Sequence, residues 1–283
     1  MEKQKCVAAI HDISGFGKCS LTVALPILSA AGIETSVLPT AVLSTHTGGF
    51  TGFTFRDLTA DLKPFAAHWR SLELSFDCLY SGFLGSIDQL DIVSEIFGWF
   101  RKNNAMILVD PAMADNGRLY STFSPDFVRG MAAFCAGADL IVPNMTEAAF
   151  LLGESYQPGP YDKPAVERIL RNLSAMGPQQ VVLTGVWFGD EQLGAAVYDR
   201  DTGETSYAFH KKIDGLYHGT GDVFASALLG ALLNGFTLTR AAQIAVDFTA
   251  NSIERTLAAG TDARFGVKFE QELPGYIRRL GLI

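Results

Sequence analysis

The stretch HGTGDVFAS, residues 218–226, places a carboxylate, Asp222, directly behind Gly219, Thr220 and Gly221. The apolar run that follows predicts a buried helix that begins near Thr220, with Asp222 in its first turn. The first N–H groups of a helix have no internal acceptors and favour an anion. Asp222 could simply stabilise that helix end. Such an anion cradle beside a carboxylate could also stabilise a phosphoryl group in transfer while the carboxylate accepts a hydroxyl proton.

A second polar motif, PNMTE at 143–147, spaces Asn144 and Glu147 three residues apart on one helical face. Asn144 is a good N-cap residue, and Glu147 would complete a capping box. The same two side chains could instead act through water on Mg²⁺, which prefers oxygen ligands and keeps much of its hydration. Asp110, at the end of MILVD, adds a carboxylate at the same predicted sheet edge.

The segment HTGGFTGF, residues 46–53, is rich in glycine and aromatic residues. It could be an ordinary surface loop. A mobile flap over a small ring substrate would use the same residues, with glycine for hinging and Phe50 and Phe53 for excluding water.

The segment GFGKCS, residues 15–20, resembles two nucleotide-binding motifs and fits neither. The P-loop pattern fails because Asp12 and Cys19 stand where it needs Gly and Ser or Thr. The dinucleotide pattern fails because Ser20 replaces its last glycine. We interpret the segment as a tight strand-to-helix turn, or as a turn that also lets a ligand approach Asp12 or Ser14.

The elements that position these motifs alternate along the chain. Strands are predicted for the compact apolar runs KCVAAI, IETSVL, FDCLYSG, MILVD, DLIVP and QQVVLT. Helices are predicted for LTVALPILSAAG, IDQLDIVSEIFGWFRKNN, SPDFVRGMAAFCAG and PAVERILRNLSAMG, although Pro26 counts against an unbroken first helix. The alternation predicts an α/β fold with a mostly parallel sheet and helices on both faces.

After residue 190 the pattern changes. LGAAVYDR and TSYAFHKK, joined by DTG, predict an antiparallel pair at one edge of the sheet, and VFASALLGALLNG and RAAQIAVDFTANSIERTLAAG predict two further helices. No repeat or linker divides the chain, so we expect one domain over 1–283 with a flap-like loop around 39–56. Polar clusters follow successive predicted strands, and ligands of open α/β sheets bind beyond the carboxyl ends of strands. The sequence therefore predicts an active site at this edge.

Composition excludes several classes of function. The net charge of −8 argues against a nucleic-acid or anionic-membrane surface. The cysteines are widely spaced and the histidines form no metal-binding cluster, which predicts reduced thiols and no zinc site. No window is long and apolar enough for a membrane span. We therefore expect a soluble, cytoplasmic protein.

Together these motifs resemble the ribokinase-like superfamily, and within it the pyridoxal kinase family. GTGD and the NxxE of PNMTE resemble the superfamily, while HTG at 46–48, SGFLGS at 81–86 and DPAMAD at 110–115 resemble the vitamin B6 kinases. The resemblance covers nearly the whole chain. It implies a three-layer ribokinase-like fold and ATP-dependent phosphorylation of the 5′-hydroxymethyl group of pyridoxal, pyridoxamine or pyridoxine. It also implies Mg²⁺ and a homodimer, and it leaves a monovalent cation open.

The resemblance assigns roles residue by residue. Asp222 would be the base, and the amides of Gly219, Thr220 and Gly221 would form the anion hole. Nucleotide-side positions would be Asp110, Asp115, Tyr120, Asn144, Glu147, Thr184 and Gly185, with Asn144 and Glu147 organising Mg²⁺ through water. Substrate-side positions would be Asp12, Ser14, His46, Thr47 and Phe83.

Three substrate-side positions depart from the family pattern. Asp12 stands where the family commonly has Ser, Phe83 where it often has Tyr, and Thr45 where it often has Asn. The alternatives are a hydroxymethylpyrimidine kinase of thiamine synthesis and a non-catalytic vitamer-binding protein on the same scaffold. Relatives of the former commonly carry Cys at the position of Asp222, and the retained GTGD and NxxE residues argue against the latter.

Overall fold

A nine-stranded sheet forms the centre of the computed structural model, which describes residues 4–101, 105–215 and 217–283. Its strands are in the order β11-β10-β9-β8-β5-β4-β1-β2-β3. Their bounds are β1 Cys6–Ser14, β2 Glu34–Leu43, β3 Phe55–Asp57, β4 Cys78–Ser81, β5 Met106–Val109, β8 Leu140–Ile141, β9 Gln180–Val186, β10 Gln192–Asp199 and β11 Glu204–Lys211. A separate small hairpin joins β6, Ala114–Asp115, to β7, Arg118–Leu119.

The central strands from β2 to β9 pair in parallel, and both edges of the sheet are antiparallel. The predicted pair β10–β11 is confirmed. The other antiparallel edge, between β2 and β3, was not predicted. Three exposed residues form β3, so it has no apolar alternation by which a sequence pattern could reveal it.

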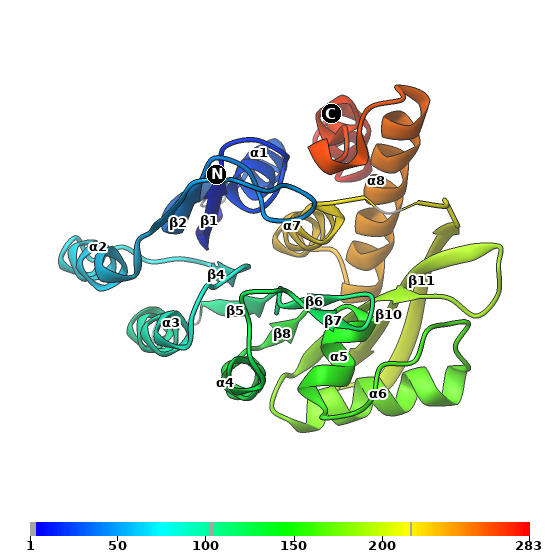
Figure 1. Ribbon diagram of the computed structural model, residues 1–283, viewed down its shortest axis with the longest axis horizontal. Helices are drawn as coiled ribbons and strands as arrows, with labels where there is room; N and C mark the ends of the chain where they lie inside the picture. The colour runs from blue at the N-terminus through cyan, green and yellow to red at the C-terminus, as the bar shows by residue number, and fades with distance from the viewer. Residues whose placement is uncertain (1–3, 102–104, 216) are drawn as a thin grey trace.

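Helices cover both faces of the sheet, as the α/β alternation predicted (Figure 1). One layer contains α1 Leu21–Ala30, α7 Thr220–Leu233, α8 Leu238–Ala258 and α9 Leu273–Arg279. The other contains α2 Thr59–Ser71, α3 Ile87–Phe100, α4 Pro125–Ala136, α5 Met145–Leu151 and α6 Lys163–Ala175. Short 3₁₀ turns lie at Ala263–Phe265 and Phe269–Gln271.

Two apolar cores lie on opposite faces of the sheet because neighbouring strand residues point in opposite directions. In β1, Val7 packs into the core under α1 and α7, and Ala8 packs into the core under α2 to α6. In β4, Tyr80 packs into the core under α1 and α7, and Leu79 packs into the core under α2 to α6. Parallel strands buried on both faces have continuous apolar runs, which is why the sequence predicted them well.

Three sequence expectations need correction. Pro26 does not break the first helix, because α1 continues to Ala30 with Ile27 and Leu28 fully buried against the sheet, and this packing outweighs one lost backbone hydrogen bond. Strand β1 continues through Ser14, so Asp12 and Ser14 belong to the strand rather than to the turn after it. The loop expected around 39–56 is shorter, since residues 39–43 lie in β2 and 55–56 in β3. Residues 102–104, at the end of the second predicted helix, lie outside the described residues.

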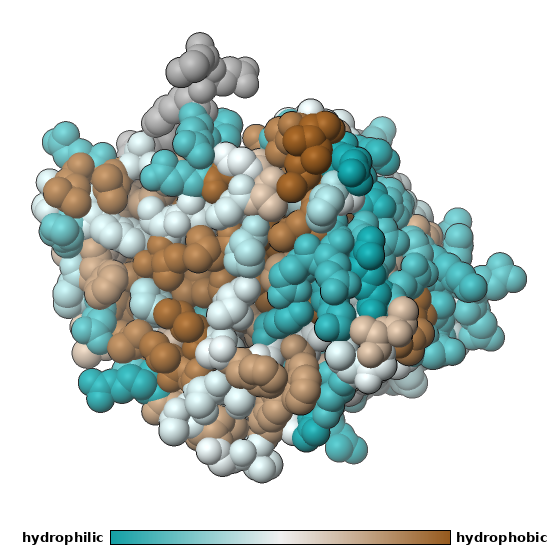
Figure 2. Space-filling model, turned by 90° about the horizontal axis from the view of Figure 1, so that it is seen from above, coloured by the Kyte–Doolittle hydropathy of each residue, from teal (hydrophilic) through white to brown (hydrophobic). Residues whose placement is uncertain are grey.

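Apolar and hydrophilic side chains separate on the face seen in Figure 2, with brown areas gathered towards one half and a broad teal area on the other. Exposed large apolar residues include Phe55 on β3, Phe65 on α2 and Ile87 on α3. No helix among the described residues is long and apolar enough to cross a membrane.

Candidate active site

The polar clusters predicted at strand ends lie along one edge of the sheet. Asp12 and Ser14 end β1, Asp110 follows β5, and Asn144 follows β8. A backbone bridge joins Asn144 to Thr184 near the end of β9. Helix α7 begins among them, because Asp222 interacts electrostatically with both Asp12 and Asp110.

Helix α7 starts at Thr220, as predicted, and its N-terminus has no side-chain cap. Gly219 has a φ of 76°, in the left-handed region, and a Cβ there would stand 2.2 Å from the Lys18 carbonyl oxygen. Glycine is therefore required on both conformational and steric grounds. No side chain among the described residues caps the first amides of α7, and an uncapped helix N-terminus can bind an anion.

Asp222 lies in the first turn of α7 and is partly exposed at the mouth of the site. Burial raises its pKa to about 7, the neighbouring Ser20 amide lowers it, and the nearby Asp12 carboxylate raises it. A carboxylate with such a pKa ionises near neutrality, in the range suited to a general base.

Asp110 faces the start of α7, since a Cβ on Gly221 would stand 3.9 Å from its Oδ2. Burial first, and then repulsion from Glu147 and Asp222, hold the pKa of Asp110 well above its usual range. Asp110, Glu147 and Asp222 therefore lie close together, an arrangement that a cation would stabilise.

Asn144 and Glu147 form a complete capping box at the start of α5, one of the two roles left open by the sequence. The Asn144 Oδ1 accepts hydrogen bonds from the amides of Thr146 (2.8 Å) and Glu147 (2.9 Å), and the Glu147 Oε2 accepts one from the Asn144 amide (2.8 Å). The Glu147 Oε1 accepts a further bond from Met113 at 3.1 Å. Burial still raises the pKa of Glu147 to about 8.

These contacts limit how a metal could bind. Within the described residues no group of three or more His, Cys, Asp or Glu side chains could hold a metal ion directly. Both Glu147 oxygens already accept hydrogen bonds, but Asp110 and Glu147 still supply the hard oxygen atoms that Mg²⁺ prefers. That donor set fits a Mg²⁺ ion that keeps its water and binds mainly through a ligand's phosphates.

The remaining nucleotide-side positions lie around this acid cluster. Burial raises the pKa of the Tyr120 hydroxyl well above its usual value. Four nearby acids raise it further: Glu147, Asp115, Asp110 and Asp222. Asp115 is exposed at the end of β6 and interacts with His218.

Thr184 and Gly185 lie in β9. The Thr184 amide bonds to the Pro143 carbonyl oxygen at 2.9 Å, which ties β9 to the start of the NxxE motif. Gly185 has a φ of 73° and open space where a Cβ would stand. This strand end is therefore free to approach a ligand.

On the substrate side, Asp12 and Ser14 form one unit. The Ser14 hydroxyl donates to Asp12 Oδ2 at 2.9 Å, and the Ser20 hydroxyl donates to Asp12 Oδ1 at 2.5 Å. All three residues are buried. Burial raises the pKa of Asp12, and the two hydroxyls lower it.

The loop at residues 44–54, called the flap, contacts two distant segments. It meets His218, which directly precedes the anion cradle of Gly219, Thr220 and Gly221, and it meets the turn that contains Arg264. The His46 Nδ1 accepts a bond from the Gly48 amide at 3.1 Å, so Nε2 carries the proton and donates to the Arg264 carbonyl oxygen at 2.7 Å. The His46 ring lies 5.2 Å from that of His218, the residue before Gly219. The Phe50 ring lies 4.9 Å from His46.

Two residues predicted to contact the substrate, Thr47 and Phe83, are not connected to the other substrate-side residues by hydrogen bonds among the described residues. Thr47 is exposed, and its side chain takes part in none of the hydrogen bonds found within the described ranges. Phe83 is half-buried after β4, and its ring packs 5.5 Å from Phe123. Among the described residues, no hydrogen bond joins either residue to Asp12 or Asp222.

Sequence reasoning missed Ser20 and His218. Ser20 drew notice only as the residue that breaks the GxGxxG pattern, and that failure was the available signal. Its φ of 56° is the kind of backbone angle that a glycine there would adopt without strain. His218 opens the HGTGD stretch, and nothing in its spacing indicated that the flap would meet it.

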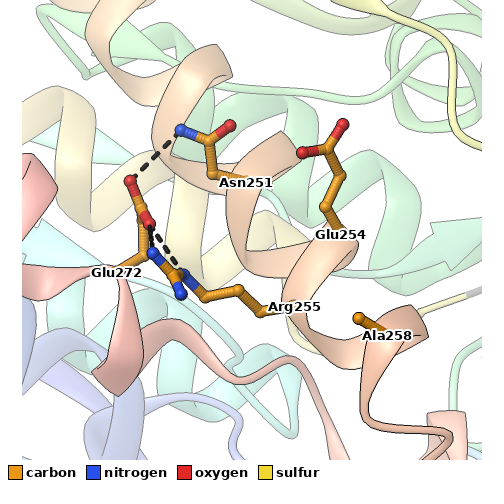
Figure 3. Close-up of a pocket in the computed structure, with 5 residues that line it drawn as sticks. All are labelled: Asn251, Glu254, Arg255, Ala258 and Glu272. Atoms are coloured by element: carbon orange, nitrogen blue, oxygen red, sulfur yellow. Dashed lines mark hydrogen bonds and ion pairs between the residues drawn. The ribbon is translucent and has the colours of Figure 1, made fainter.

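A separate pocket lies between α8 and the C-terminal segment, lined by Asn251, Glu254, Arg255, Ala258 and Glu272 (Figure 3). Glu272 points into the cluster and accepts hydrogen bonds from Asn251, Arg255 and Arg279. Because these donors satisfy the carboxylate, the cluster clamps α9 to α8 and is not a second reactive site.

Comparison with known proteins bears on the whole chain. The phosphomethylpyrimidine kinase family matches residues 36–266. The chain belongs to this family. A Bacteroides thetaiotaomicron member, provisionally described as a phosphomethylpyrimidine kinase and crystallised with pyridoxal, is 39% identical, with 97% of this chain and 96% of that one covered and a TM-score of 0.92.

A second member of the family, pyridoxal kinase from Lactobacillus plantarum, is 33% identical with 98% of both chains covered and a TM-score of 0.88. A thiamine biosynthesis multifunctional protein of Corynebacterium efficiens is 28% identical over 218 residues, 76% of this chain but only 28% of that protein. The kinase family and the ribokinase-like fold expected from the motifs are confirmed.

Proposed function

We propose that this chain transfers the γ-phosphoryl group of ATP to the 5′-hydroxymethyl group of pyridoxal, pyridoxamine or pyridoxine. One observation carries the proposal: an acid with a pKa of about 7 stands in the first turn of a helix whose N-terminus has no side-chain cap among the described residues. The relative crystallised with pyridoxal supports the choice of substrate class.

The site residues divide the work of transfer. The substrate hydroxyl oxygen forms a bond to the γ-phosphorus, the bond from that phosphorus to the β–γ bridging oxygen breaks, and ADP leaves with the electron pair. Asp222 takes the hydroxyl proton. The amides of Gly219, Thr220 and Gly221 stabilise the negative charge of the phosphoryl group in transfer.

Other residues hold the reactants. Asn144, Glu147 and Asp110 would hold Mg²⁺ through water, and the ion when bound neutralises charge on the ATP phosphates. Asp12 and Ser14 face the substrate, and the flap with His46 and Phe50 excludes water. Asp115, Tyr120, Thr184 and Gly185 border the nucleotide. The homodimer stays a prediction that sedimentation can test.

The second candidate, phosphorylation of hydroxymethylpyrimidine, is favoured by the family that matches residues 36–266. One assay separates the candidates: purified protein with Mg-ATP and pyridoxal, pyridoxamine, pyridoxine or hydroxymethylpyrimidine in parallel. We expect a 5′-phosphate from at least one B6 vitamer, with kcat/KM above that for the pyrimidine. Turnover of the pyrimidine alone would assign the thiamine role, and binding of vitamers without turnover would assign a non-catalytic role.

A further inference from the structure

Ser20 has a backbone conformation that its residue type does not explain. Its φ of 56° and ψ of −129° lie where residues with a side chain are rarely found. It occupies the N-cap position of α1, yet its side chain makes no capping hydrogen bond. A serine at this position usually caps its own helix, so the strain and the diverted side chain need another cause.

Two contacts supply that cause. The Ser20 hydroxyl donates to the Asp12 Oδ1 at 2.5 Å. The Ser20 amide lies beside the Asp222 carboxylate and lowers its pKa. Asp12 is on β1 and Asp222 on α7, so a single residue connects the substrate-side acid to the acid proposed as the base. The unusual backbone angles of Ser20 direct its hydroxyl towards Asp12 and its amide towards Asp222.

The surroundings fix Ser20 in this place. It is 5% exposed and pairs with Ile13 through a backbone bridge. The same turn touches the cradle, because the Lys18 carbonyl oxygen occupies the space that a Cβ on Gly219 would need. A shift of Ser20 would therefore disturb both the carboxylates and the anion cradle.

We propose that Ser20 is a positioning residue for phosphoryl transfer, whose hydroxyl holds the Asp12 carboxylate and whose turn packs against the start of α7 beside Asp222, so that the two acids act as a coupled pair. The inference rests on the proposed role of Asp222 as the base. It adds a residue that touches neither the hydroxyl nor the phosphoryl group and acts through both acids.

The coupling predicts the direction in which the pKa of Asp222 changes when the Ser20 hydroxyl is removed. The Ser20 hydroxyl favours the charged form of Asp12, and charged Asp12 raises the pKa of Asp222. Without the hydroxyl, Asp12 becomes more easily protonated and repels Asp222 less, so the Asp222 pKa falls. The other titratable groups in electrostatic contact with Asp222 are Cys19, Tyr80, Asp110 and Tyr120.

The test is the pH dependence of kcat/KM for the best vitamer in Ser20→Ala, Ser20→Gly and Thr22→Ala. Thr22 is the matched control, because its hydroxyl also lies at the start of α1 but donates to the Cys19 carbonyl oxygen. We expect kcat to fall roughly tenfold in both Ser20 variants. We also expect the fall of kcat/KM on the acidic side of the profile, the acidic limb, to occur at a pH roughly one unit lower than in the wild type. Ser20→Gly accepts the backbone angles without strain, so it keeps the test open if Ser20→Ala fails to fold.

A double variant isolates the coupling. Asp12→Asn should move the acidic limb downward by itself, and adding Ser20→Ala to it should move the limb no further. A limb that stays at the wild-type pH, or rises, in Ser20→Gly would overturn the positioning role. Failure of the base assignment is distinguishable, since it would leave Asp222→Asn active.

Discussion

Helices α5 and α7 both begin at the active-site edge of the sheet, and both carry an acid in the first turn, but the two N-termini are built differently. At α5 the side chains of Asn144 and Glu147 occupy the free backbone groups. At α7 no side chain among the described residues caps the helix, and Asp222 instead lies beside the amide of Ser20 on another segment. One helix end is closed by its own residues, and the other is left open for a ligand.

The difference shows that an acid in the first turn is not a sufficient sign of catalysis. Glu147 stabilises its helix through hydrogen bonds that Asp222 does not make. What distinguishes Asp222 is that, within the described residues, neither it nor any other side chain caps its helix. Four expectations sharpen or break this contrast.

The largest effect is expected for Asp222→Asn. The amide side chain cannot take the hydroxyl proton, so kcat for vitamer phosphorylation should fall by roughly 10²–10⁴-fold. Pyridoxal binding, measured by calorimetry, should persist. Turnover within a few-fold of wild type would show that α7 carries no base.

Gly219→Ala should be nearly as damaging. The new Cβ adds strain at a φ of 76° and collides with the Lys18 carbonyl oxygen, so the cradle must move. A displacement of about 1 Å at reacting groups can lower kcat roughly 100-fold.

Gly235→Ala, just beyond the other end of α7, is the matched control for Gly219→Ala. Gly235 has a φ of 85° and nothing within 4 Å of a built Cβ. It should lose only roughly 1–2 kcal/mol of unfolding free energy and keep its kcat. Equal kcat in the two variants would show that the cradle geometry is not needed.

The remaining expectations concern stability rather than activity. Asn144→Ala removes the α5 cap and should lower the unfolding free energy by about 1 kcal/mol. Asp222→Asn should raise it above pH 7, because the folded-state pKa of Asp222 lies above its unfolded value and the wild type loses stability as pH rises from about 4 to 7.

The gain is at most roughly 4 kcal/mol, and it should vanish below pH 4, where both states are protonated. Urea unfolding at pH 4 and pH 8 measures both variants. A loss of stability for Asp222→Asn at pH 8 would mean that Asp222 caps its helix after all.

The sequence was most informative where function and local pattern coincide. Asp222, Asn144 and Asp110 each follow a strand or open a helix with a recognisable motif, so their gathering at one edge could be predicted. The NxxE pattern could not decide between cap and metal organiser, because both roles use the same residues.

The features that could not be predicted from the sequence depend on contacts between distant segments. The meeting of Ser20 with Asp12 and Asp222 requires the irregularity in β1 and the packing of the turn on Gly219. Helix α2 was not predicted because Pro64 lies inside it and it buries only Leu62 and Ala66, too little for a clear apolar period.

The central claim is that the open end of α7 holds a base whose pKa is raised by burial. The most direct test is the pH dependence of kcat/KM for the wild-type enzyme, which reports ionisation of groups in the free enzyme. We predict an acidic limb with an apparent pKa near 7, with activity falling about tenfold for each pH unit below it. Constant activity down to pH 5 would contradict the claim, because an ordinary aspartate, with a pKa near 4, would then account for the profile.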